Sequence, residues 1–312
     1  MRGDRRTRAD DHEGPPRRLY GRRLRARPGL APTAEEIALA AQAACVLEVS
    51  APKPGNVNRY ADFANTRLED FLLSAVAIGP ALARAGRAGV GQIIWQAVRD
   101  SQRLVCTNTN LGILLLLAPL AKACLGAGEL RENLAQVLAG LTVEDARQAY
   151  AAIRLARPGG LGRAPQADVA EEPTITLYQA MSLAQERDSI AREYVTNFAI
   201  TFEIGYPALR EAWHAADSPA DAIVQTYLTL LARVPDTLIA RKRGAEVAGQ
   251  VSRWAAEVLG AGGVFTAQGR QALVDLDRDL RNERHTLNPG TTADLTAAAI
   301  FLVLLYDSCK DR

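Results

Sequence analysis

The stretch Leu111-Gly-Ile-Leu-Leu-Leu-Leu-Ala-Pro-Leu120 decides the fold class, because it is a continuous apolar run without the polar–apolar alternation of a strand. A second run, Ala297–Tyr306, lies near the end of the chain. Both are shorter than the ~20 residues that a membrane-spanning helix needs. We therefore expect two helices buried in a protein core and no membrane partner.

The composition around these runs also favours helices. The 312 residues are 48% hydrophobic but only 5% aromatic, with Ala and Leu dominant. A core of small and aliphatic side chains suits closely packed helices, whereas sheets favour β-branched and aromatic residues. With no alternating pattern and no repeat period, the sequence predicts an all-α protein. We expect residues 33–312 to form one globular domain of about a dozen helices.

Capping residues and breakers set the expected helix boundaries. Thr33 with Glu36 and Thr66 with Glu69 have capping-box spacing, and Thr142 precedes Asp145 in the same way. Ser218-Pro219 supplies an N-cap and a proline at the first helical position. The expected helices cover residues 33–49, 66–85 with a bend at Pro80, 90–104, 109–125, 129–140, 142 onward, 174–184, 187–204, 206–216, 219–233, 236–260, 266–282 and 291–308.

Two further segments are expected to be irregular. Residues 1–32 carry ten Arg against four acidic residues and lack hydrophobic periodicity, which predicts a disordered basic tail. The remaining chain holds 27 basic and 31 acidic side chains, so it shows no sign of a nucleic-acid-binding surface. The Gly/Pro-rich stretch 157–173 is either a domain linker or a lid over a site. No secretory apolar segment opens the chain, and we expect a cytoplasmic protein.

The cysteines and histidines predict neither a zinc site nor a disulfide framework. Four widely spaced cysteines lie in apolar surroundings and are expected to be buried thiols: Cys45, Cys106, Cys124 and Cys309. Three histidines are too few for a histidine metal site. His285 is either a surface loop residue or a substrate contact. Trp95, Trp213 and Trp254 fall at helical positions, where core or subunit contacts are expected, and the sequence leaves a homodimer possible.

The first segment with chemical potential is Glu48-Val-Ser-Ala-Pro-Lys-Pro-Gly-Asn-Val-Asn-Arg-Tyr-Ala-Asp62. Prolines on both sides of Lys53 stiffen the loop and would fix the direction of its ammonium group, as a phosphate site requires. Glu48 and Asp62 could supply carboxylates nearby. The alternative is a plain proline-rich turn with a solvated lysine.

The second segment, Cys106-Thr-Asn-Thr-Asn-Leu-Gly112, leads into the first apolar run. Short polar side chains make good N-caps, which would be their only role in the simplest interpretation. However, four consecutive polar residues exceed the needs of one cap. A helix N-terminus also offers free N–H groups and positive potential to an anion. Asn108 and Thr109 are therefore candidate binding residues.

Two more segments combine carboxylates with helix starts. In Val234-Pro-Asp-Thr-Leu-Ile-Ala-Arg-Lys-Arg-Gly244, Asp236 begins a helix and a basic cluster that includes Arg241 follows. In His285-Thr-Leu-Asn-Pro-Gly-Thr-Thr-Ala-Asp294, Thr291 could cap the last helix. Asp294 would then lie in its first turn, where it could bind Mg²⁺, which prefers carboxylate and phosphate oxygens. Simple capping is the alternative for both segments.

Together these segments resemble the triphosphoribosyl-dephospho-CoA synthase family over roughly residues 35–308. The resemblance is carried by Pro52-Lys53-Pro54-Gly55 after Glu48, by Asn108-Thr109, by Asp236 with Arg241 and Gly244, and by Asn288-Pro289-Gly290 with Ala293-Asp294. Members of this family are all-helical and transfer the 5-triphosphoribosyl group of ATP to the ribose 2′-hydroxyl of dephospho-CoA, releasing adenine. The resemblance implies ATP and a nucleotide-like acceptor as substrates and Mg²⁺ as cofactor.

The resemblance also implies roles for individual residues. Lys53 and Arg241 would contact phosphates, and Asn108, Thr109, Asn288 and Gly290 would bind substrate. Asp236 and Asp294 would be catalytic carboxylates or metal ligands, and Glu48 and Asp62 candidate general bases. Asp188 matches a further acidic position more loosely.

The chain departs from the family pattern at the proposed site. Typical members have Asn-Thr-His-Lys-Gly where this chain has Asn108-Thr109-Asn110-Leu111-Gly112, and Gly-Gly-Ser-Ala-Asp where it has Gly290-Thr291-Thr292-Ala293-Asp294. The loop after Asn56 lacks the usual histidine. These changes resemble a branch linked to one-carbon cofactor biosynthesis, and that resemblance implies another acceptor or another phosphate donor as the alternative. A catalytically inactive nucleotide-binding helical protein is the third alternative.

Overall fold

The computed structural model describes residues 31–282 and 284–307, so nearly all of the predicted basic tail lies outside the described residues. All regular structure in these residues is helical, which confirms the all-α prediction. The α-helices are α1 (Ala34–Ser50), α2 (Leu68–Ala77), α3 (Gly79–Leu82), α4 (Val90–Gln102), α5 (Leu111–Cys124), α6 (Leu130–Ala139), α7 (Val143–Ala156), α8 (Leu177–Ala184), α9 (Ser189–Val195), α10 (Tyr206–Ala215), α11 (Pro219–Arg233), α12 (Thr237–Arg243), α13 (Ala245–Gly260), α14 (Ala267–Leu280) and α15 (Gly290–Tyr306).

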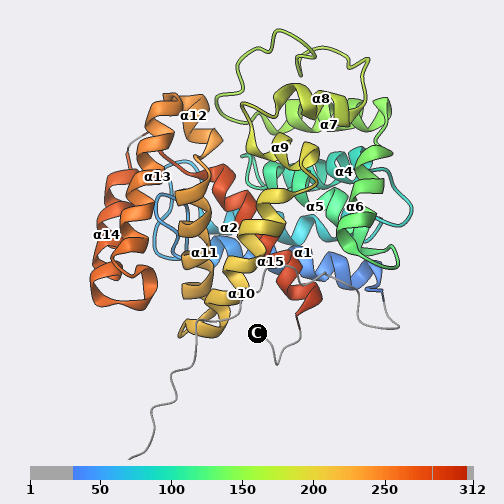
Figure 1. The fold of residues 1–312 in the computed structure, drawn as a ribbon. Coiled ribbons are helices and arrows are strands. Elements are labelled where there is room, and N and C mark those ends of the chain that lie inside the picture. The colour runs from blue at the N-terminus through green and yellow to red at the C-terminus, as the bar shows by residue number, and fades with distance from the viewer. Residues whose placement is uncertain (1–30, 283, 308–312) are drawn as a thin grey trace, which may run out of the picture.

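The two apolar runs form the centre of the core, as predicted. Nearly every residue of α5 and of the first part of α15 is buried. α15 packs against α1, α5, α10 and α11, and Figure 1 shows it running through the middle of the molecule with α12–α14 on one side and α4–α8 on the other. Because α5 and α15 are enclosed on all sides, their sequences need no polar face.

Three expected helices are divided in the structure. The helix expected at 66–85 becomes α2 and α3, because Pro80 has no N–H to continue the helical hydrogen bonds. The helix expected at 236–260 divides at Gly244, whose φ of 94° is incompatible with a helix. The helix expected at 187–204 ends at Val195, because Asn197 and Phe198 have positive φ values of 53° and 58°. A π-helical turn, Thr201–Gly205, follows before α10.

The predicted caps are partly confirmed. Thr33 and Thr142 form capping boxes with Glu36 and Asp145. The box predicted at Thr66 and Glu69 is wrong by one residue, since Arg67 occupies the N-cap and Asp70 accepts a bond from its backbone N–H. Asp62 also accepts from Leu68 N at 2.9 Å, so two carboxylates serve this helix start.

The last helix begins earlier than expected. Pro289 occupies its N-cap position and Gly290 is its first residue, so the prediction that Thr291 caps the helix is wrong. A side chain from another helix, described below, takes over the capping of this N-terminus.

Two of the predicted buried thiols are confirmed and one is not. Cys45 and Cys124 are buried, whereas Cys106 is exposed in the loop before α5. Cys309 lies outside the described residues. Across residues 31–282 and 284–307, no helix combines the length and apolarity required to span a membrane.

Glu193 of α9 is a fully buried carboxylate that fixes the turn after its own helix. Its oxygens accept from Ile200 N at 2.9 Å and from the N–H and hydroxyl of Thr201 at 2.7 and 2.5 Å. Burial raises the pKa of Glu193 to about 7, although these hydrogen bonds oppose the rise. The folded protein therefore holds a proton here that the unfolded chain releases near the ordinary value of 4.5.

This pKa shift predicts that Glu193 makes the protein less stable as pH rises from about 5 to 8. Between the two pKa values the folded state binds more protons than the unfolded state, so stability falls with increasing pH, by up to about 3 kcal/mol for this group. Glu193→Gln removes this contribution. Urea unfolding of both proteins at pH 5 and pH 8 measures it, and an identical pH dependence of the unfolding free energy in the two proteins would contradict the assignment.

Candidate functional site

Asp236 joins the beginnings of two helices. As the N-cap of α12, its Oδ1 accepts from Leu238 N and Ile239 N at 2.9 and 3.0 Å. Its Oδ2 accepts from the N–H and hydroxyl of Thr292 in α15, at 2.7 and 2.8 Å. The side chain is buried, and burial raises its pKa while the four hydrogen bonds lower it. All four acceptor positions of this carboxylate are therefore occupied by protein donors.

The beginning of α9 meets the same region. Ser189 N donates to the hydroxyl of Thr237 at 3.2 Å, and this hydroxyl lies 3.2 Å from that of Thr291. Asp188 caps α9 through Oδ1 and pairs through Oδ2 with Arg241 Nη1 at 2.5 Å. The guanidinium of Arg241 is thus fixed at the N-terminus of α9, and its position is set by a carboxylate that sequence matching had identified only loosely.

Asp294 lies against the first turn of α5. A Cβ atom placed on Gly112 would lie 2.0 Å from Asp294 Oδ2, so the carboxylate occupies the space that the missing side chain leaves. Asp294 is half-buried, and its side chain makes no hydrogen bond or ion pair within the described residues. Burial raises its pKa well above the ordinary value, and the carboxylates of Glu48, Asp236 and Asp188 raise it further, while Arg241 opposes them. Asp294 is therefore the carboxylate that is open to a ligand.

Glu48 and Lys53 form a buried ion pair beneath Asp294. Lys53 is 0% exposed, and its ammonium contacts Glu48 Oε1 at 2.9 Å, the backbone oxygen of Glu48 and Ala51 O at 3.3 Å. Burial raises the pKa of Glu48, and Lys53 opposes that shift. Since all three ammonium donors have acceptors, Lys53 does not face open space in this structure, and the pair instead fixes the shape of the Pro52–Gly55 loop.

Gly55 brings this loop against the segment before α15. It adopts a φ of 76°, and an added Cβ would lie within 3.1 Å of Leu280 and Pro289, so only glycine fits. Gly55 N donates to Asp277 Oδ1 at 2.8 Å, and Arg281 donates to Asn56 O at 2.8 Å. The loop after Glu48 is therefore attached to the end of α14.

His285 closes this side of the region. Its ring stacks on Phe63 with centroids 3.9 Å apart, and its Nε2 accepts from Ala64 N at 3.4 Å. Lys242 donates to His285 O at 3.2 Å. Burial, followed by Arg281 and Lys242, lowers the pKa of His285, which favours the neutral imidazole with its proton on Nδ1.

Four helix N-termini meet here, those of α5, α9, α12 and α15. Contacts of Gly112 with Asp294, of Asp236 with Thr292 and of Ser189 with Thr237 connect them. Helix N-termini carry positive potential, which favours an anion such as a phosphate chain, although protein caps already occupy several of the N–H groups here. The arrangement places this potential beside a carboxyl group and a guanidinium group.

Unpartnered polar atoms also gather here. Five of the nine buried side-chain atoms without a hydrogen-bond partner in the described residues belong to this region: Asn110 Nδ2, Ser189 Oγ, Arg241 Nε, His285 Nδ1 and Asn288 Oδ1. Buried polar atoms normally find partners, because leaving one unpaired costs about 1–3 kcal/mol. Donors and acceptors left open in one region indicate a binding site for a polar ligand.

The remaining predicted site residues differ in their burial and in their contacts. Asn108 is exposed and accepts from Leu111 N at 3.2 Å, and Thr109 is buried and donates to Ser74 Oγ at 2.6 Å. Gly290 approaches Leu238 so closely that an added Cβ would lie 2.6 Å from it. Asp62 is exposed, and its hydrogen bond to the start of α2 is a capping contact, so nothing connects it to Asp294. The roles predicted for these residues stay predictions.

Sequence reasoning missed three residues that the geometry singles out. Asn110, Gly112 and Ser189 were not selected as site residues. Gly112 had a detectable signal, since it is the only glycine in α5, a helix rich in leucine and alanine, where glycine costs about 1 kcal/mol. Asn110 and Ser189 resemble ordinary capping residues in the sequence, and only their unpaired atoms distinguish them.

The two predicted metal ligands, Asp236 and Asp294, differ in their ability to bind Mg²⁺. The described residues contain no group of three or more His, Cys, Asp or Glu side chains arranged to hold a metal ion. Asp236 does not fit as a ligand, because its oxygens are already saturated. The open carboxylate of Asp294 does fit, since Mg²⁺ bound to a nucleotide commonly uses one or two protein carboxylates together with phosphates and water.

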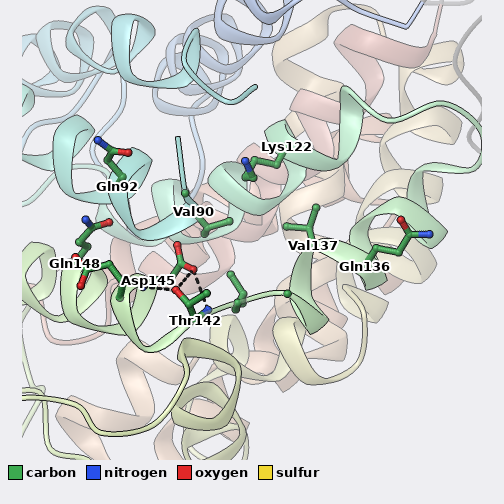
Figure 2. Close-up of a pocket in the computed structure, with 12 residues that line it drawn as sticks. Val90, Gln92, Lys122, Gln136, Val137, Thr142, Asp145 and Gln148 are labelled. Carbon is green, nitrogen blue, oxygen red and sulfur yellow. Dashed lines mark hydrogen bonds between the residues drawn. The ribbon is translucent and has the colours of Figure 1, made fainter. Parts of the chain in front are cut away.

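A separate hollow of about 460 Å³ lies between α4, α6 and α7 (Figure 2). Its ionisable groups are satisfied within the protein. Asp145 accepts from Gly91 N, Thr142 N and the Thr142 hydroxyl, and Lys122 donates to Ala85 O and Ala88 O. These contacts connect neighbouring helices, so the hollow lacks the open groups that mark the Asp294 region.

Comparison with known proteins identifies the family of the chain. The family model of ATP:dephospho-CoA triphosphoribosyl transferase matches residues 34–311. A crystal structure described as a triphosphoribosyl-dephospho-CoA synthase from Archaeoglobus fulgidus aligns with a TM-score of 0.60 and 31% identity, covering 76% of this chain and 99% of that one.

Curated relatives match over shorter stretches. A protein from Pseudomonas savastanoi pv. phaseolicola named probable 2-(5″-triphosphoribosyl)-3′-dephosphocoenzyme-A synthase is 29% identical over 150 residues, which are 42% of this chain and 51% of the relative. A protein of the same name from Pseudomonas putida is 34% identical over 98 residues, 31% of this chain and 34% of the relative. These alignments thus span about half of one relative and a third of the other. Because the family model covers nearly the whole helical body, the chain belongs to the ATP:dephospho-CoA triphosphoribosyl transferase family.

Proposed function

We propose that this protein transfers the 5-triphosphoribosyl group of ATP to a hydroxyl group of a nucleotide-like acceptor and releases adenine. Dephospho-CoA is the first candidate acceptor, because the matched family is named for it. The observation that carries the proposal is the open carboxyl of Asp294 at the meeting point of four helix N-termini. This arrangement combines a site for a phosphate chain with a group able to act at a sugar.

The proposed reaction breaks the bond between C1′ of the ATP ribose and N9 of adenine, and joins C1′ to the acceptor oxygen. Positive charge develops on the sugar as the bond to adenine lengthens, and a carboxylate beside it stabilises that charge. The acceptor hydroxyl loses a proton and adenine gains one. Asp294 is the carboxyl that we assign to this centre, because Glu48 is paired with Lys53 and Asp236 is saturated.

Arg241 and the unpaired donors around it are the groups that we assign to the triphosphate. The charge of Arg241 is already oriented by Asp188, so little ordering is needed when a phosphate binds. We also propose Mg²⁺ as a companion of the triphosphate, where it would neutralise phosphate charge. We propose a cytoplasmic location as well, because the proposed reaction consumes ATP, and a homodimer stays a prediction.

A different acceptor is the second candidate, and Asn110 favours it. This residue stands where typical family members have histidine, and its Nδ2 is buried without a partner. The chemistry offered to the acceptor or to the base therefore differs from the family pattern at this point. An acceptor from one-carbon cofactor biosynthesis would fit such a change.

The test is incubation of the protein with ATP and Mg²⁺, with and without dephospho-CoA, followed by chromatography for free adenine. Adenine that appears only with dephospho-CoA supports the first candidate. Adenine that appears only with another hydroxyl acceptor, such as a pterin or furan precursor, supports the second. No adenine with any acceptor, while ATP still raises Tm, would instead indicate a binding protein.

Gly112→Ala is expected to lower adenine release about a hundredfold or more. Its Cβ would lie 2.0 Å from Asp294 Oδ2, so the carboxylate must move away from its site. A misplacement of about 1 Å in a catalytic group can cost a factor of this size. Steady-state rates of adenine formation check the prediction.

Gly249→Ala in α13 is the matched control. Its nearest neighbour would be Arg253 Nη1 at 3.8 Å, so the added methyl meets no obstacle. This variant should keep full activity and gain slight stability from alanine's higher helix propensity. If Gly112→Ala were as active as Gly249→Ala, Asp294 would not need its present position.

A further inference from the structure

A second hollow, which we name the Trp95 cleft, adjoins the Asp294 region. Its volume is about 670 Å³, and it is lined by the end of α4, the loop before α5 and the end of α7. Trp95, Thr107, Asn108, Arg154 and Arg157 are among its lining residues. α4 and α7, which supply most of the lining residues, pack side by side (Figure 1).

The cleft connects to the proposed active site at two points. Asn108 lines the cleft and also bonds to Leu111 N, one residue before the glycine that Asp294 contacts. Arg157 begins the Gly/Pro-rich segment 157–173. Two residues later, Gly159 and Gly160 lie close to the side chains of Lys242 and Arg241, where an added Cβ would be 3.4–3.5 Å away. This segment thus runs from the cleft to the basic turn of α12.

The charge of the lining suits an anion. Its two ionisable side chains other than Cys106 are arginines, and none of its lining residues is acidic. Arg154 is partly engaged, since Nη1 donates to Val169 O at 2.7 Å and Nη2 lies 4.0 Å from Glu172 Oε1. Arg157 is exposed, and its guanidinium group forms no hydrogen bond or ion pair within the described residues.

The backbone at Arg157 gives an independent indication. Arg157 follows the last residue of α7 with φ 49° and ψ 57°, in the left-handed region. Glycine is the usual residue at this position of a helix end, because a Cβ there is unfavourable. Glycine occurs close by in Pro158-Gly159-Gly160, yet position 157 itself holds an arginine. An arginine that accepts this strain, and whose guanidinium is unpaired, is positioned for a ligand.

Trp95 supplies the apolar part of the cleft. Its indole is half-buried and packs against the core, while the remaining surface lines the hollow. An indole face stacks well on a purine base. A nucleotide that carries phosphates would therefore find a stacking surface, two guanidinium groups and the hydroxyl and amide of Thr107 and Asn108 in one cleft.

We propose that the Trp95 cleft binds the adenosine-diphosphate end of the acceptor, with Arg157 and Arg154 on its phosphates and Trp95 against its base. This inference rests on the proposed function, because it assigns the donor to the helix N-termini and the acceptor to the cleft. The acceptor hydroxyl would then reach Asp294 past Asn108. Dephospho-CoA has such an end, and other nucleotide-bearing acceptors share it.

Calorimetric titration of Arg157→Gly with dephospho-CoA and, separately, with ATP and Mg²⁺ tests the assignment. Glycine relieves the left-handed backbone, so this variant should have an unchanged or higher Tm, and a binding defect cannot be blamed on misfolding. We expect dephospho-CoA to bind about tenfold more weakly, which corresponds to one lost charge-assisted contact, and ATP to bind as in the wild type. Arg163→Ala, an exposed arginine of the same segment outside the cleft, should change neither affinity.

Tryptophan fluorescence adds a second measurement. Dephospho-CoA should quench the tryptophan fluorescence of the wild type and of Trp254→Phe, whereas Trp95→Phe should lose that quenching.

The inference is overturned if Arg157→Gly binds dephospho-CoA with wild-type affinity. It is also overturned if the variant loses as much affinity for ATP, or if the wild type binds no dephospho-CoA. Failure of the proposed function is distinguishable: binding that depends on Arg157 without adenine release removes the reaction and keeps the cleft. If Arg157→Gly releases adenine with an unchanged KM for dephospho-CoA, the proposed reaction is kept and the cleft is removed as the acceptor site.

Discussion

Asp294→Asn should reduce adenine release from ATP about a thousandfold while the protein stays folded. The carboxylate has no hydrogen bond or ion pair within the described residues, so its amide isostere breaks no contact there. The amide cannot take up a proton or carry negative charge, and each such function is worth about 10²–10⁴-fold in rate. The variant should be as stable as the wild type or more stable, because three neighbouring carboxylates oppose a charge at this position. Rates of adenine formation and thermal unfolding measure the two effects.

A matched control and a metal titration sharpen this experiment. Asp217→Asn removes a carboxylate that is 96% exposed, and it should leave the rate unchanged. If Asp294 acts mainly as a Mg²⁺ ligand, raising the Mg²⁺ concentration should restore part of the activity of Asp294→Asn. If it acts at the sugar or on a proton, Mg²⁺ should restore none. A fully active Asp294→Asn protein would remove Asp294 from the reaction.

Asp236→Asn should cause the largest loss of stability, about 3–5 kcal/mol. The amide group cannot accept hydrogen bonds on both of its ends, so either the N–H groups at the start of α12 or those of Thr292 lose their acceptor. A lost cap costs about 1 kcal/mol, and each buried donor without a partner costs about 1–3 kcal/mol. For a protein of this size, Tm should fall by roughly 5–10 °C. Urea unfolding and calorimetry measure both quantities.

Thr33→Ala is the reference for a cap that serves one exposed helix start. Thr33 accepts from Glu36 N at 3.1 Å, and its loss should cost only about 1 kcal/mol. The additional unfolding free energy that Asp236→Asn loses then measures the contribution of the Asp236 contact between α12 and α15. An Asp236→Asn protein as stable as the wild type, yet without adenine release, would show that Asp236 faces the ligand, as the sequence had suggested.

The fold class was predictable because its signals are local. The runs beginning at Leu111 and Ala297 are apolar on every face, and a helix enclosed by other helices is the arrangement that tolerates this. The capping boxes at Thr33 and Thr142 depend on neighbouring residues only, and both were predicted correctly. The wrong boundary at Thr291 has a tertiary cause: Asp236, at the start of α12 and 56 residues before Thr292, caps α15.

The candidate site was only partly predictable for the same reason. The loops selected from the sequence do come together in the fold, since Asp236, Arg241 and Asp294 lie near the end of α1. It could not show that Lys53 turns inward to Glu48 or that Asp62 caps α2, because both outcomes depend on which acceptor is nearest after folding. The Gly112–Asp294 contact joins two helices more than 180 residues apart, and no local pattern reports such a pair.

The central position of α15 has a consequence for biosynthesis. The helix that carries Asp294 is the last in the described chain, and it supplies the surface on which α1, α5 and α11 pack. Until α15 has been made, the faces of α1, α5 and α11 that pack against it stay exposed to water or to a chaperone. Nucleotide affinity and a stable fold should therefore appear together, only after α15 has left the exit tunnel.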